Sequence, residues 1–110
     1  MKLLNLIALS TTLFISTEMS IAQTTVLNKR LAQTIDSLKN ADQAPATIQD
    51  SKEAEEAFKK VTRSNLPLVK SIARTHGFPG YDLVGKESSN NYWLLVQHSD
   101  FDISFQKQAL

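Results

Sequence analysis

The run YWLLVQH, residues 92–98, consists of five apolar residues followed at once by two polar ones. Ser88 or Ser89 can cap a helix that begins near Asn90, because a serine hydroxyl accepts a hydrogen bond from an otherwise unpaired amide. A helix that is apolar on nearly every side usually lies at the centre of a core. A buried strand is the alternative, since short apolar runs do not separate the two by periodicity. We expect a central helix over residues 90–98.

Helical geometry fixes the direction of the two polar residues that end this run. Gln97 lies four residues after Trp93, and His98 lies four residues after Leu94, so both polar side chains are expected to point toward the core. A buried amide or imidazole without a partner costs about 1–3 kcal/mol, so each needs a hydrogen bond. The candidate partners are polar side chains and loop backbone: Asp100, Asp102, Asp42, Gln43 and the backbone of residues 77–85.

Two roles are open for His98. In the first, the imidazole is a general base or a metal ligand that a carboxylate such as Asp100 orients. In the second, Gln97 and His98 tie the loop at residues 78–89 to the core, and Asp100 only caps a helix. His98 and Asp100 are two residues apart and do not share a helix face, which disfavours a metal site, and we expect no cofactor. The other histidine, His76, is expected to be exposed at a helix end.

Apolar residues recur at helical spacing before this run as well. A first helix is expected from Val26 to about Ala41, with its cap at Thr24 or Thr25. A linker over residues 42–49 follows, because proline and small polar residues gather there. A capping-box-like start at Asp50 then opens a second helix that runs to about residue 62.

Serine, asparagine, proline and glycine mark the boundaries of the next segments. Ser64 or Asn65 is expected to cap a third helix, in whose first turn Pro67 is tolerated, and Gly77 is expected to end it. The segment at residues 78–89 should be an irregular loop, with a short extended piece at residues 81–84. Asp100 or Asp102 then caps a last helix that begins near Ile103 and continues to the end of the sequence.

The first 22 residues have the order of a secretory signal peptide. Lys2 is followed by an apolar run at residues 3–15, and small residues at Ser20 and Ala22 mark cleavage before Gln23. The apolar run falls short of the roughly 20 residues that cross a bilayer, so no membrane anchor is expected after cleavage. The mature protein is expected in the periplasm or outside the cell. The alternative is a buried helix of a cytoplasmic protein.

Composition excludes several classes of protein. The chain has 110 residues, a formal net charge of +1 and no cysteine, so it has no disulfide and no thiol nucleophile. Basic and acidic residues are mixed along the sequence, which is not the pattern of a nucleic-acid binder. A domain at residues 23–110 is small and buries only about 60–65% of its unfolded surface. Added stability would then come from an oligomer, a ligand or further chain.

Three motifs together resemble a bacterial family known as domain of unknown function 6624. They are GFPG at residues 77–80, Val84-Gly85, and WLLVQHSD at residues 93–100. Members of that family have a glycine-aromatic-proline turn, a following glycine, and a Gln-His-Ala/Ser-Asp motif after an apolar segment. The similarity covers about residues 30–110. This sequence has Phe78 where tryptophan is commoner, and family members continue past the region of residues 106–110, so a C-terminally truncated member is expected.

The resemblance implies a mostly helical, secreted or cell-associated protein with no assigned activity. It also implies a set of candidate site residues. The candidate catalytic residues are His98, Asp100 and Gln97. The candidate ligand-binding residues are Asp42, Gln43, Gly77, Pro79 and Gly85.

The sequence as a whole predicts a mostly α domain of four to five helices with one irregular glycine-proline loop, preceded by a signal peptide. Three functions stay open. The first is an exported binding or interaction module for a small molecule or a protein, and not for nucleic acid. The second is a hydrolase-like enzyme that uses His98 as general base, and the third is a truncated family member with little independent function.

Overall fold

A computed structural model describes residues 27–109 of the chain. Within that range the chain forms five α-helices and one 3₁₀ turn, with no strand, which confirms the prediction of a mostly α domain. The predicted signal peptide at residues 1–22 lies outside the described residues. The elements in chain order are α2 (Lys29–Gln43), η1 (Ala44–Thr47), α3 (Ser51–His76), α4 (Tyr81–Val84), α5 (Lys86–Gln97) and α6 (Ile103–Ala109).

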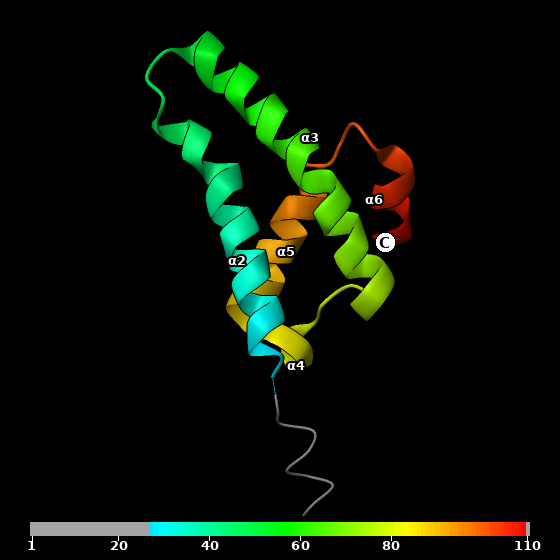
Figure 1. The fold of residues 1–110 in the computed structure, drawn as a ribbon. Coiled ribbons are helices and arrows are strands. Elements are labelled where there is room, and N and C mark those ends of the chain that lie inside the picture. Colours follow the sequence, from blue (N-terminus) through cyan, green and yellow to red (C-terminus); the bar gives the residue numbers. More distant parts are fainter. Residues whose placement is uncertain (1–26, 110) are drawn as a thin grey trace, which may run out of the picture.

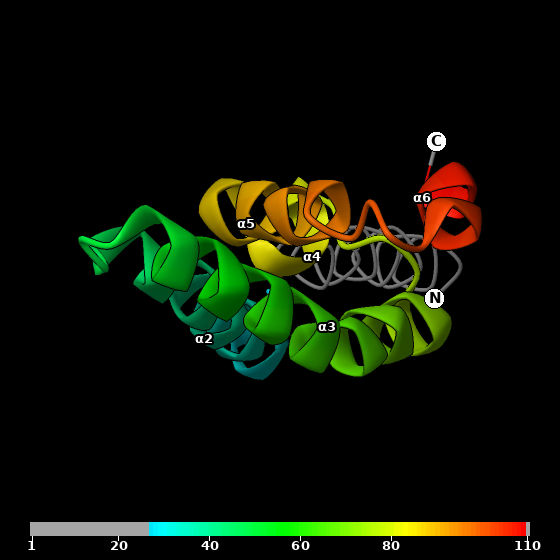
Figure 2. The ribbon, with the colours of Figure 1, turned by 90° about the horizontal axis from the view of Figure 1, so that it is seen from above.

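The helices form two layers. Helices α2 and α3 run antiparallel, and the turn at residues 44–50 joins them at one end (Figure 1). Helices α5 and α6 lie on one face of this pair, as the view from above shows (Figure 2), and α4 lies at the end opposite the turn (Figure 1). None of the described helices is both long enough and apolar enough to cross a membrane.

Helix α5 lies at the centre of the core, as predicted. Tyr92, Leu95 and Val96 are buried, and they pack in one cluster with Ile35 of α2 and Val69 of α3. Because residues 92–96 are helical, the alternative of a buried strand is wrong. The Tyr92 hydroxyl also donates a hydrogen bond of 2.8 Å to the Val69 carbonyl, so its polar end is satisfied within the core.

Helix α5 begins four residues earlier than predicted, and its serines do not cap it. Gly85, at a φ of 85°, stands at the N-cap position. The Ser88 hydroxyl donates to Asp36 of α2 at 2.8 Å, and the Ser89 hydroxyl donates to the carbonyl of Pro79 at 2.8 Å. Both serines are buried, so these bonds satisfy hydroxyls that the helix carries into the core.

Helix α3 is a single 26-residue helix, and the prediction of two helices separated near Ser64 is wrong. Pro67 lies inside it and, having no N–H, leaves the Arg63 carbonyl without its usual intrahelical donor. Arg63 is exposed, so water can satisfy that carbonyl. Asn65, predicted as a cap, is buried and donates its side-chain amide to the Leu38 carbonyl at 3.2 Å. Tertiary packing on both sides of the proline keeps the helix continuous.

Helix α2 begins three residues later and ends two residues later than predicted. Its N-cap is Asn28, whose side-chain oxygen accepts a hydrogen bond of 3.0 Å from the Leu31 amide. The predicted caps at residues 24–25 lie outside the described residues. At the other end, Asp42 and Gln43 are its last two residues, although the prediction placed both in the linker.

The segment after Gly77 is more regular than predicted. Residues 81–84 form a single helical turn, α4, where the sequence suggested an extended piece. Gly77 does end α3, as predicted. Its φ of 74° is one that residues with a side chain rarely adopt. The predicted loop at residues 78–89 therefore reduces to two short connections on either side of α4.

Helix α6 begins at Ile103, as predicted. Of the two expected capping residues, Asp102 takes the role, because its carboxylate accepts a hydrogen bond of 3.0 Å from the Phe105 amide. The other oxygen of the same carboxylate lies 3.0 Å from the Lys70 ammonium of α3. The side chain of Gln106 donates to the carbonyls of Val96 and Gln97, so α6 is tied to both α3 and α5.

We expect Tyr92→Phe to lower the free energy of unfolding by about 1 kcal/mol at neutral pH, because the variant loses one buried hydrogen bond. Burial raises the pKa of the Tyr92 phenol from 10.0 to about 12. The wild type should therefore lose stability as the pH rises from 10 toward 12, and this loss should be smaller in the variant. Urea denaturation at neutral and alkaline pH measures both effects. Equal stability of the two proteins at neutral pH would contradict the role assigned to this hydroxyl.

We expect Asp102→Asn to destabilise the protein slightly at neutral pH, and to destabilise it less as the pH falls below 3.8. The hydrogen bond from Lys70, and then that from the Phe105 amide, lower the pKa of Asp102 below 3.8. Because the folded state favours the ionised carboxylate, Asp102 stabilises the fold at pH values above 3.8. This contribution to stability is lost as the pH falls from 3.8 through the pKa of Asp102 in the folded protein. Thermal melts between neutral pH and pH 2 test this, with Asp100→Asn as the control on the same turn. A constant difference across this range would disprove the effect.

Candidate functional site

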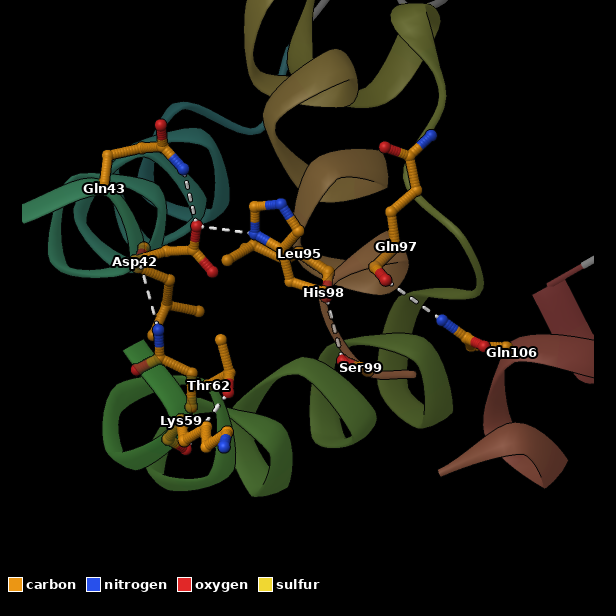
Figure 3. Close-up of polar contacts among 11 residues, drawn as sticks. Asp42, Gln43, Lys59, Thr62, Leu95, Gln97, His98, Ser99 and Gln106 are labelled. Atoms are coloured by element: carbon orange, nitrogen blue, oxygen red, sulfur yellow. Dashed lines mark hydrogen bonds and ion pairs between the residues drawn. The ribbon is translucent and has the colours of Figure 1, made fainter. Parts of the chain in front are cut away.

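The polar cluster at the end of α5 is built around a hydrogen bond between His98 and Asp42. His98 is the C-cap residue of α5, and its Nδ1 lies 2.7 Å from Oδ2 of Asp42 in the last turn of α2 (Figure 3). Asp42 was one of four predicted partners for His98. The sequence did not indicate which of them would be used, because the two residues are 56 positions apart.

The Asp42 carboxylate is buried, and a second donor holds it. Only 1% of its side-chain surface is exposed. The Gln43 amide donates a hydrogen bond of 2.7 Å to Oδ2, the same oxygen that contacts His98 (Figure 3). Burial of a carboxylate is tolerated only when hydrogen bonds compensate the lost hydration, and these two bonds do so. Asp42 and Gln43, both predicted site residues, are thus brought together with His98.

The tautomer of His98 follows from this bond. An ionised carboxylate only accepts hydrogen bonds, so Nδ1 carries the proton that Asp42 accepts. In the neutral ring Nε2 then has a free lone pair. Nε2 has no protein partner among the described residues, and no buried side-chain nitrogen there lacks a partner, so Nε2 is accessible to solvent. It points away from Asp42 (Figure 3).

The His98 ring is held from a second side by an aromatic contact. The Phe58 ring of α3 meets it edge-on, with ring centres 5.0 Å apart and planes at 78°. The side chain of His98 is 26% exposed, so the ring is anchored without being sealed. Asp42, Phe58 and the helix end thus fix the imidazole in one orientation, which is what a positioned acid or base requires.

His98 lines a cavity of about 280 Å³ between α3 and the turn that follows α5. Charged side chains of both signs surround it, and one pair among them, Lys59 and Glu55, forms an exposed ion pair at 3.0 Å. The guanidinium of Arg63 lies 5.5 Å from the centre of the Phe101 ring, which is within the range of a cation–π interaction. The lining residues are Glu55, Phe58, Lys59, Thr62, Arg63, His98, Asp100 and Phe101.

The predicted inward direction of Gln97 is wrong. Its side chain is exposed, and only its backbone carbonyl is engaged, by Gln106. The prediction assumed that the Trp93 face of α5 lies in the core, but Trp93 is only half-buried. Gln97 therefore continues an edge of the helix that faces α6 and solvent, and the structure does not bring it to the His98 cluster.

Asp100 does not orient His98. It is exposed in the turn after α5, and it shares the cavity lining with His98 while Asp42 makes the hydrogen bond. His76 is exposed at the end of α3, as predicted. Within residues 27–109 no three histidine or acidic side chains are arranged to hold a metal ion.

The predicted ligand-binding residues Gly77, Pro79 and Gly85 lie at the other end of α5. Gly85 is the N-cap of that helix and His98 is its C-cap, so the twelve residues between them separate the two groups. Pro79 is buried, and its carbonyl accepts the hydrogen bond from Ser89. The expected role in which His98 ties the loop at residues 78–89 to the core is therefore wrong, and these residues position α4 and α5.

Phe58 was not among the site residues expected from the sequence. The helical pattern placed it on the apolar face of its helix, where phenylalanine is ordinary core packing. Nothing in the local sequence distinguishes it, because its contact with His98 depends on the crossing of α3 and α5. Arg63 and Phe101 were missed for the same reason.

Comparison with protein-family models finds no matching family, and comparisons with curated proteins and with solved structures find no match either. The resemblance to domain of unknown function 6624 therefore stays a prediction.

We expect diethyl pyrocarbonate to modify His98, because this reagent attacks an unprotonated, accessible imidazole nitrogen. Peptide mass spectrometry should find the adduct on both His98 and the exposed His76. Asp42→Asn should change the rate of modification of His98 and leave the rate of modification of His76 unaltered, since only His98 contacts that carboxylate. Protection of His98 in the folded wild type would disprove the assigned access to Nε2.

Proposed function

We propose that this chain is an exported helical protein that binds a small ligand beside His98, and that His98 acts on this ligand as a general base in a hydrolase-like reaction. The observation that carries the proposal is the 2.7 Å bond between His98 Nδ1 and the buried Asp42, with Nε2 left accessible. The export part of the proposal rests on the signal-peptide pattern at residues 1–22. Membership of the domain of unknown function 6624 family is part of the same proposal.

The proposed reaction uses water as the nucleophile. Nε2 of His98 takes a proton from water while the water oxygen attacks the carbonyl carbon of an ester, and Asp42 stabilises the imidazolium that forms. The tetrahedral intermediate then collapses with cleavage of the bond between the carbonyl carbon and the leaving-group oxygen. The imidazolium gives its proton to the leaving group, which restores the neutral base. No serine or cysteine lines the adjoining cavity in the described part of the chain. Thr62 does line it, but its hydroxyl donates a hydrogen bond of 3.1 Å to the Lys59 carbonyl.

The cationic side chains of the cavity support this chemistry. Attack on a carbonyl carbon places negative charge on its oxygen, and a nearby cation stabilises that charge. Lys59 shares its charge with Glu55, whereas Arg63 lies against Phe101 without a carboxylate partner among the described residues. Arg63 is therefore the proposed contact for the developing oxyanion.

Hydrolysis of p-nitrophenyl acetate, followed by the release of p-nitrophenolate, tests the proposal. We expect the wild type to exceed an equal concentration of free imidazole, and His98→Gln to lower the protein-dependent rate by roughly 100-fold, the lower end of general-base contributions. Asp42→Asn should lower it less, because the imidazole stays but loses its orientation and charge partner.

The matched control is His76→Gln, which removes an exposed imidazole at the end of α3. We expect this variant to keep the wild-type rate. Circular dichroism of all three variants verifies that the helices are intact. If His98→Gln were folded and as active as His76→Gln, His98 would not be a base, and a binding module would be the better description.

A further inference from the structure

A second cavity lies outside the His98 cluster, between the last turns of α3, helix α6 and the residue that follows Gly77. Its volume is about 320 Å³, within the range of sites that hold small molecules. It shares no lining residue with the cavity at His98. The lining residues are Lys70, Ala73, Arg74, Phe78, Phe105 and Gln108.

The inner wall of this cavity is aromatic. Phe105 is buried, with 3% of its surface exposed, and Phe78 is half-buried. Their ring centres are 6.1 Å apart with planes at 35°, and Phe78 also stacks on Trp93. Rings held in this way present a fixed apolar surface against which a further flat ring can pack.

The two charged side chains that line the cavity are both cationic. Lys70 and Arg74 lie one helical turn apart on α3, and no carboxylate lines the cavity within the described residues. Lys70 forms an ion pair with Asp102, whereas Arg74 has no ion-pair partner in the part of the chain that the structure describes. Arg74 is exposed, so its planar guanidinium is available for a bidentate bond to a carboxylate.

We propose that this cavity binds a small aromatic carboxylate, with the ring of the ligand against Phe78 and Phe105 and its carboxylate on Arg74. Lys70 adds positive charge beside the same carboxylate, and Gln108 supplies an amide at the rim. A cavity lined by two aromatic rings and two cationic side chains favours a ligand that combines a flat apolar ring with an anionic group. This site does not depend on the activity proposed for His98.

Benzoate is the probe, and its uncharged analogue benzamide is the control ligand. Titration of the isotope-labelled protein, followed by the backbone amide signals, should show saturable shifts at Ala73, Phe105 and Gln108, with a dissociation constant in the millimolar range for so small a ligand. We expect benzamide to bind at least about fivefold more weakly, because it forms no charge-assisted bond with Arg74.

Three variants separate the charge and the shape of the site. Arg74→Gln should weaken benzoate binding about fivefold or more and leave benzamide unchanged. Arg30→Gln, which removes an exposed arginine of α2 that lines neither cavity, should change neither affinity. Ala73→Leu should fill the cavity and abolish binding, while circular dichroism shows the helices retained.

The proposal is overturned by any one of four results. They are equal affinities for benzoate and benzamide, shifts confined to other parts of the protein, no saturable binding, and unaltered benzoate affinity in the folded Ala73→Leu variant.

Discussion

The burial of α5 against the pair of α2 and α3 is the interaction on which the rest of this structure depends. Tyr92 and Ile35 have no exposed surface, and Val69 has 1%, so three helices meet in one tightly packed core. Without disulfides, a chain of this size relies on such apolar contacts for its stability. Hydrogen bonds then set the orientation of α5, since Asp36 of α2 accepts from both Ser88 and Asn91.

The position of the candidate site follows from that packing. Helix α5 ends where α2 ends, so the C-cap residue His98 meets the last turn of α2 and its buried carboxylate. The same crossing brings Phe58 of α3 against the imidazole ring. A site made of residues from three helices is held by the core itself, and no long loop takes part in orienting it.

Local pattern was sufficient to predict several elements. The apolar run at residues 92–96 predicted α5, and Asp102 before Ile103 predicted the start of α6, because both signals act within one or two turns. The helix start predicted near Pro67 was wrong because it also rested on a local rule. Asn65 and Val69 are buried on either side of the proline, and their packing keeps α3 continuous. The predicted inward direction of the Gln97 side chain was wrong, because burial of the Trp93 face of α5 depends on where α6 lies. Asp42 was one of four side chains predicted as candidate partners of His98, and only the tertiary fold selects it among them.

The bond between His98 and Asp42 joins positions 56 residues apart, which has a consequence for the order of folding. Contacts between distant segments form only after the loss of chain entropy has been offset by other interactions. The hairpin of α2 and α3 is closer in sequence and can form first. The imidazole and its carboxylate therefore meet only in the finished bundle, and a nascent or partly unfolded chain contains the two groups without the pair. Any chemistry at this position would begin with the completion of folding and cease with the first global opening.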